Sequence, residues 1–202
     1  MMSFIDPTTL ILASIIVFFG ALTQSLIGFG LAVVASPLLY IVNPQLVPVP
    51  IIVMGFAISA MTLFRERGHL QFNGLQYALL GRIPGGFLGA GLLLFAPQAI
   101  LGLVIAAIVF IAVILSIFRF SAPINRLSLF IAGVFSGIFG NIAAIGGPPM
   151  AILLAGQDPS QFRAALSAFF VFSSLIALAI LAIVGLVEVK HLWLSLLLLP
   201  SV

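Results

Sequence analysis

Long apolar runs separated by short polar turns dominate this chain of 202 residues. The apolar runs cover residues 10–27, 31–42, 46–64, 72–95, 98–118, 127–154 and 162–187, and a last one begins at residue 192. Because an α-helix rises 1.5 Å per residue, about 20 apolar residues cross the roughly 30 Å hydrocarbon core of a bilayer. Most of the runs have about that length. The pattern therefore predicts an all-α polytopic membrane protein.

Two of these runs are interrupted by glycines and small polar residues. The first interruption covers residues 20–30 and ends in Gly28-Phe29-Gly30, and the second covers residues 133–149 and ends in Gly146-Gly147-Pro148-Pro149. In lipid, backbone that leaves the helical ladder survives only where it is buried in protein or lines a cavity. Two such breaks in corresponding positions indicate the binding site of a transporter.

The first break requires a bend. As one straight helix, residues 8–42 would be on the order of 50 Å long, which exceeds the hydrocarbon thickness. We favour a re-entrant helical hairpin with its tip at Gly28-Phe29-Gly30, and a tilted, broken single span is the alternative.

The chain also contains a weak internal repeat, so that it forms a single transmembrane domain (residues 1–202) with two similar halves. Residues 35–39 resemble 147–151, and 75–85 resemble 191–201. The first repeat covers residues 8–118 and the second 127–202, and each opens with a glycine-broken segment. Since the second half stops just after Pro200, the counterpart of Pro84, we expect its last helices to be truncated.

The basic residues indicate an orientation. The loops that carry Arg65, Arg67, Arg119, Arg126 and Arg163 share one side if the breaks are hairpins, with Lys190 on the other. The halves are then inverted and the N-terminus lies outside. If the breaks are single broken spans, Lys190 and Arg163 exchange sides, the halves are parallel and the N-terminus lies inside. Arg163 itself follows a turn and is interpreted as an interfacial anchor.

Composition narrows the function. The chain is 63% hydrophobic and 5% charged, with no cysteine and two histidines. No cofactor and no metal site is expected, because the two histidines lie far apart. The scattered basic residues do not form a nucleic-acid surface. With no mid-span aspartate or histidine, the sequence does not indicate an enzyme.

Arg82 is the charged residue expected deepest in the membrane, about ten residues or roughly 15 Å into its run. A charge there is by default a functional hypothesis. All four acidic residues lie near the ends of spans, so an anion is its natural partner. Alternatively, Arg82 caps carbonyls of a broken helix or snorkels to the interface.

The breaks supply neutral donors. A helix that starts at Leu31, or just after Asn141, would point free N–H groups into the protein. Close helix packing is the alternative role for glycines, and it suffices for Gly85, Gly89 and Gly133. The candidate substrate-binding residues are Thr23, Gln24, Ser25, Gly28, Gly30, Ser36, Arg82, Ser136, Gly140, Asn141, Gly146 and Gly147.

These motifs resemble those of the TauE/SafE family of membrane anion transporters, also described as sulfite exporters. The resemblance rests on residues 23–37, on the stretch Arg82-Ile83-Pro84-Gly85-Gly86-Phe87-Leu88-Gly89, and on residues 133–148. The first break contains fewer glycines than is usual in the family, because Leu31-Ala32 follows Gly30. The resemblance implies export of sulfite, sulfonates or other small sulfur-containing anions.

We therefore expect a multi-pass secondary transporter in a bacterial-type plasma (inner) membrane. Its partners are a small anionic substrate and the lipid bilayer, with no nucleic acid, and a homodimer is compatible with the sequence. The alternative from another class is an anion channel or a non-transporting membrane scaffold.

Overall fold

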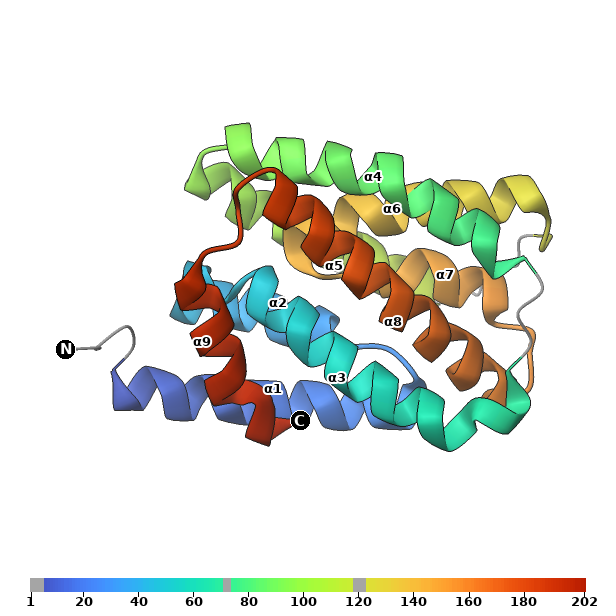
Figure 1. The fold of residues 1–202 in the computed structure, drawn as a ribbon, viewed down its shortest axis with the longest axis horizontal. Coiled ribbons are helices and arrows are strands. Elements are labelled where there is room, and N and C mark those ends of the chain that lie inside the picture. The colour runs from blue at the N-terminus through green and yellow to red at the C-terminus, as the bar shows by residue number, and fades with distance from the viewer. Residues whose placement is uncertain (1–5, 71–73, 118–122) are drawn as a thin grey trace.

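The computed structural model describes residues 6–70, 74–117 and 123–202. For residues 115–117 it describes the backbone only. The described regular structure is helical throughout (Figure 1). The α-helices are α1 (Pro7–Ile27), α2 (Leu31–Val42), α3 (Val49–Glu66), α4 (Leu75–Phe95), α5 (Gln98–Ile117), α6 (Arg126–Ala143), α7 (Gly147–Leu154), α8 (Pro159–Ile183) and α9 (Val189–Leu198). Short 3-10 turns, η1 (Pro44–Leu46), η2 (Arg67–His69) and η3 (Leu199–Ser201), connect or end them.

Five segments are long and apolar enough to cross a membrane. They contain α1, α3, α4, α6 and α8, and α2, α5 and α9 are counted as shorter apolar helices. Large apolar side chains cover the outside of the bundle; on α1, for example, Ile11 is 62% exposed and Phe19 57%. Such a surface suits lipid rather than water, so the structure confirms the predicted all-α polytopic membrane fold.

The first break is a hairpin. Asp6 caps α1 by accepting hydrogen bonds from the backbone N–H (3.0 Å) and the hydroxyl (2.6 Å) of Thr9, which lower the pKa of Asp6. The chain then turns at Gly28 and Gly30, whose φ angles of +98° and +127° favour glycine. α2 folds back along α1 (Figure 1) so closely that a Cβ atom on Gly20 would lie 2.9 Å from the Leu31 carbonyl oxygen. The structure thus adopts the hairpin rather than a broken single span.

The second break is also a hairpin, but its position differs from the expected one. α6 continues through Asn141 to Ala143, and the N–H of Ala144 (φ +61°) closes the last turn on the Gly140 carbonyl. The prediction that a helix starts just after Asn141 is therefore wrong. α7 starts only at Gly147, because the following tandem proline suits the first helical positions and cannot continue α6.

Smaller shifts affect other boundaries. α8 ends at Ile183 instead of residue 187, because Gly185 turns the chain with a φ of +77°. α3 begins at Val49, three residues later than expected, because η1 occupies the start of that run. α4 begins at Leu75, and the earlier part of its expected span, residues 72–73, lies outside the described residues.

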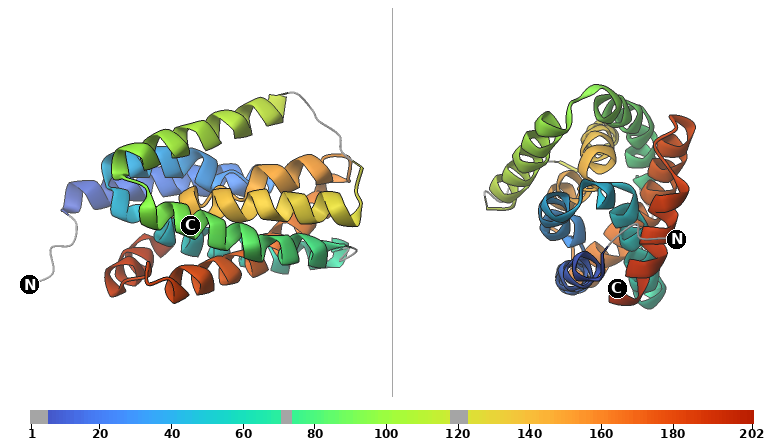
Figure 2. Two further views of the ribbon diagram at one scale, coloured as in Figure 1. Left: turned by 90° about the horizontal axis from the view of Figure 1, so that it is seen from above. Right: turned by 90° about the vertical axis from the view of Figure 1, so that its left-hand side faces the viewer.

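Loops divide between the two ends of the bundle, as Figures 1 and 2 show. The start of α1, the α4–α5 turn and the α8–α9 connection lie at one end, and Lys190 belongs to this end. The end of α3 and the starts of α6 and α8 lie at the other, and they carry Arg65, Arg126 and Arg163. Arg119, which the prediction placed with them, lies outside the described residues.

Candidate functional site

Arg82 lies buried between α4 and α6 with only 3% of its surface exposed. Its Nη1 donates a hydrogen bond to the carbonyl of Ser136, and its Nη2 donates to Oδ1 of Asn141 (3.4 Å). Its Nε, although buried, has no hydrogen-bond partner within the described part of the chain. The guanidinium is therefore only partly satisfied, and its Nε–H remains available for an acceptor.

Glycine makes this burial possible. A Cβ atom on Gly140 would lie 2.8 Å from Cζ of Arg82, so any larger residue would displace the guanidinium. Asn141 also donates from Nδ2 to the Gly86 carbonyl (3.0 Å), and the Ser136 hydroxyl donates to the Gly146 carbonyl (2.7 Å). These bonds bring several predicted residues into one group, which we call the arginine cluster. It consists of Arg82, Ser136, Gly140, Asn141 and Gly146.

Arg82 lies nearer to one end of its helix than the sequence suggested. It is the eighth residue of α4, and seven residues beyond Leu75 correspond to about 10 Å along a helix of about 30 Å. The sequence estimate of roughly 15 Å counted from residue 72. The residue is still fully enclosed by protein, which excludes snorkelling in this conformation.

No acidic residue compensates the charge of Arg82. Asp6 and Asp158 occupy the N-cap positions of α1 and α8, Glu66 pairs with Arg163 (2.9 Å), and Glu188 pairs with Lys190 (3.0 Å). These are all four acids of the chain, and all lie within the described residues. An isolated buried cation is costly, and an anion beside it removes much of that cost.

The polar residues of the first break mostly serve the hairpin itself. Gln24 donates from Nε2 to the Ser59 hydroxyl (3.0 Å), and its Oε1 accepts from the N–H of Leu31 (3.3 Å). Thr23 donates to the carbonyl of Phe19 (2.9 Å). Ser25 is half-buried. Gln24 thus caps the start of α2, a role that the sequence did not reveal.

The two breaks meet at a small space of about 40 Å³, which we call the central cavity. Its lining combines both breaks with α8: Gln24, Phe29, Gly30, Ala32, Val33, Ala144, Ile145, Gly147, Phe170 and Ser174. Nearby, the Ser36 hydroxyl donates to the Ala143 carbonyl and ties α2 to the second break. A space of this size holds a few water-sized groups.

The structure brings only some of the predicted site residues to this cavity. Gln24, Gly30 and Gly147 line it, whereas Thr23, Ser25 and Gly28 do not. Gly28 instead packs against Arg163, whose Cγ would lie 3.1 Å from a Cβ on the glycine. Ser174 was missed, although the pair Ser173-Ser174 within the apolar run of α8 was a visible signal.

Arg82 does not line the central cavity, but only a single residue of backbone separates them. A Cβ atom on Gly146 would lie 3.4 Å from Nη1 of Arg82, and the neighbours of Gly146, namely Ile145 and Gly147, line the cavity. In this conformation Arg82 binds a single carbonyl, that of Ser136 within α6, together with the side chain of Asn141.

Donors at the second break are fewer than the sequence suggested. α7 starts with Gly147-Pro148-Pro149, and proline has no N–H, so two of its first backbone donors are missing. Among the described residues no group of three His, Cys, Asp or Glu side chains is arranged to hold a metal ion. An anion placed here would find its donors in Arg82, in side-chain amides and hydroxyls, and at the start of α2.

Comparison with known families gives a match over nearly the whole chain. A family model described as "Sulfite exporter TauE/SafE" matches residues 13–202. Searches of curated proteins and of solved structures found no significant match.

Proposed function

The chain belongs to the TauE/SafE family of membrane transporters, and from this premise we propose that it exports small sulfur-containing oxyanions. The proposed substrates are sulfite and short organosulfonates, which are small and negatively charged. The proposal places the protein in a bacterial-type plasma membrane, where it moves the anion without changing it chemically.

The observation that carries the proposal is the buried charge of Arg82 without an acidic partner. Its Nε, which has no hydrogen-bond partner among the described residues, suits an oxyanion, because sulfite and sulfonate oxygens are strong acceptors. The size of the central cavity favours a small inorganic or short organic anion over a bulky ligand. Phe29 and Phe170 contribute apolar wall to this cavity, and an apolar lining strengthens the electrostatic contacts of a bound anion.

In the proposed mechanism, the anion enters the central cavity between the two hairpins. Gln24 donates to it from the first break and Ser174 from α8, and the second break shifts so that Arg82 releases the Ser136 carbonyl and turns its guanidinium to the anion. One half then rocks against the other around this site, as in transporters built on two broken-helix segments. The guanidinium returns to the carbonyl when the anion leaves, so the empty protein does not keep a bare buried charge.

Counterflow in liposomes tests this function. Vesicles that contain the purified protein are loaded with unlabelled sulfite and diluted into a trace of radiolabelled sulfite. We expect transient accumulation of label above equilibrium and saturation of the initial rate with sulfite concentration. Linear flux without counterflow would indicate a channel, and the absence of any flux above protein-free vesicles would refute transport of sulfite.

A further inference from the structure

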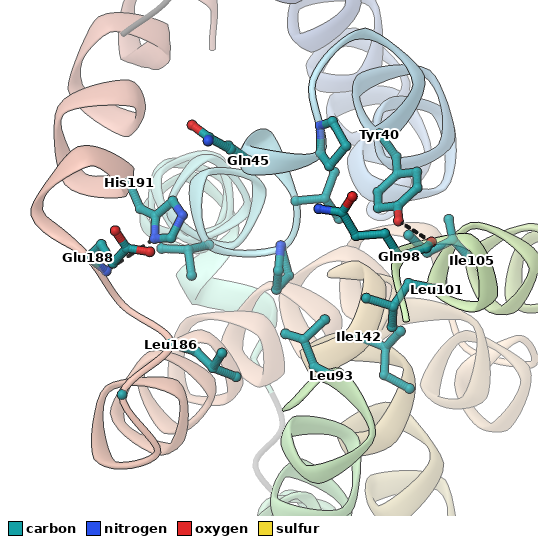
Figure 3. A pocket seen from close by; sticks show the side chains of 15 residues that line it. Tyr40, Gln45, Leu93, Gln98, Leu101, Ile105, Ile142, Leu186, Glu188 and His191 are labelled. Atoms are coloured by element: carbon teal, nitrogen blue, oxygen red, sulfur yellow. Dashed lines mark hydrogen bonds between the residues drawn. The ribbon is translucent and has the colours of Figure 1, made fainter. Parts of the chain in front are cut away.

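A second cavity (Figure 3) lies at the end of the bundle where α1 begins. Its volume is about 220 Å³, several times that of the central cavity. Its walls come from the end of α2 and η1, from α4 and α5, and from the connection between α8 and α9. Positive residues concentrate at the opposite end of the bundle, so the positive-inside rule places this cavity on the extracytoplasmic side. We call it the outer cavity.

The outer cavity combines an apolar floor with hydrogen-bond donors at its rim. Leu93, Leu101 and Ile142 form part of the floor. The side chains of Gln98 and His191 point toward the space from different walls (Figure 3), while the Tyr40 hydroxyl is turned to the Gln98 carbonyl (2.6 Å).

The capping interaction at the start of α9 determines which ring nitrogen of His191 carries a proton and can donate a hydrogen bond. Nδ1 of His191 accepts a hydrogen bond from the backbone N–H of Glu188 (3.1 Å), so the neutral ring carries its proton on Nε2. Burial, together with the charge of Lys190, lowers the pKa of His191 and outweighs the opposing effect of Glu188. The ring is therefore neutral at pH 7 and keeps an N–H donor. The carboxylate of Glu188, the acid at this rim, is paired with Lys190.

The outer and central cavities are close neighbours. On α2, Val33 lines the central cavity and Tyr40 the outer one, and seven residues of helix separate them by about 10 Å. On the second break, Ile142 lines the outer cavity and Ala144 the central one. Between them lie a single apolar cluster, which includes Ile142, Ala143 and Ile145, and the hydrogen bond from Ser36 to Ala143.

We propose that the outer cavity is a second, low-affinity oxyanion site through which the substrate of the central cavity leaves or enters on the extracytoplasmic side. The neutral donors of Gln98 and His191 hold the oxyanion loosely, and the apolar layer around Ile142 separates it from the central cavity. The inference rests on the proposed function for its substrate.

Single-cysteine labelling tests the site, because the natural chain has no cysteine. Gln98→Cys places a thiol in the outer cavity and keeps the backbone carbonyl that Tyr40 binds. Thr8→Cys is the control, since Thr8 is exposed at the same end of the molecule but does not line the cavity. Both are reconstituted and reacted with a sulfonated maleimide or a trimethylammonium maleimide. The resulting thioether survives sulfite, unlike a mixed disulfide.

Sulfite flux of each variant is compared before and after labelling. We expect modification of Gln98→Cys to reduce its own flux at least tenfold, and modification of Thr8→Cys to leave its flux within twofold. The anionic maleimide should react faster at Gln98→Cys than the cationic one, relative to Thr8→Cys, and methanesulfonate should slow its reaction.

Two results overturn the proposal. One is full modification of Gln98→Cys without loss of flux, and the other is faster reaction with the cationic reagent. In both cases, saturable sulfite flux of the natural protein would leave the proposed function standing. If the natural protein itself carries no sulfite, the proposed function fails first.

Discussion

At the scale of single residues, the position of the buried Arg82 guanidinium depends on the missing side chain of Gly140. Sequence reasoning found Arg82 as a membrane-embedded charge without a partner, because that inference needs only its position in an apolar run and the places of the acids. It did not find the contacts, since Ser136 is 54 positions away and meets Arg82 only because α4 and α6 approach through their glycines. Asn141 was predicted as a break residue and instead holds Arg82 and the Gly86 carbonyl from inside α6.

Gly140→Ala tests whether the guanidinium position matters. The added Cβ would lie 2.8 Å from Cζ of Arg82 and push the flexible side chain aside. We expect sulfite flux to fall at least tenfold, with a loss of stability of about 1–3 kcal/mol, the usual range for overpacking. Gly91→Ala is the control, because no atom of the described residues lies within 4 Å of a Cβ at that α4 position. Thermal unfolding and flux are measured on both, and equal flux of the two variants would contradict the role of Arg82.

At the scale of elements, the first hairpin was predictable and the second only in part. The excess length of residues 8–42 required a bend, and Gly28 and Gly30 supplied the backbone conformations for it. The end of α6 was misplaced because Gly140 and Asn141 resemble a break in sequence, yet the first fits Arg82 and the second bonds across to α4. Only the tertiary partner distinguishes a glycine that breaks a helix from one that packs it.

The tip of the first hairpin packs against an ion pair between α3 and α8 that the sequence did not reveal. Gly28 packs on Arg163, whose Nε (3.0 Å) and Nη2 (2.9 Å) both bind Oε1 of Glu66. Arg163 had been interpreted as an interfacial anchor. The pair joins the end of α3 to the start of α8 beside the tip, with side chains only 12% and 24% exposed for Glu66 and Arg163.

A double-mutant cycle measures this connection. Glu66→Gln, Arg163→Gln and the double variant should give a coupling energy of about 1–3 kcal/mol in reversible unfolding, because the pair is mostly shielded from water. The matched pair is Glu188 and Lys190, where Glu188 is 58% exposed and the coupling should stay below about 1 kcal/mol. Equal coupling in the two pairs would show that Arg163 is no more than an anchor.

At the scale of the whole molecule, two hairpins bring their breaks together around one cavity, with a buried arginine behind one break. The membrane character and the family follow from composition and motifs over residues 13–202. The two breaks indicated a binding site by general transporter architecture, but the lining of that site was not predicted, because Phe170 and Ser174 come from α8, far along the chain. The place where the two cavities approach each other could not be predicted from the sequence either, because it depends on how α2 packs against the end of α6.

The central claim is that the uncompensated charge of Arg82 binds the transported oxyanion. Its most direct test is thermal unfolding of the purified protein with increasing sulfite, compared with chloride at equal ionic strength, for the natural protein, Arg82→Lys and Arg82→Gln. The account predicts a saturable sulfite-specific rise in the unfolding temperature for the natural protein, a weaker rise for Arg82→Lys, which keeps the charge, and none for Arg82→Gln. A folded Arg82→Gln protein that sulfite stabilises as much as the natural one would contradict it.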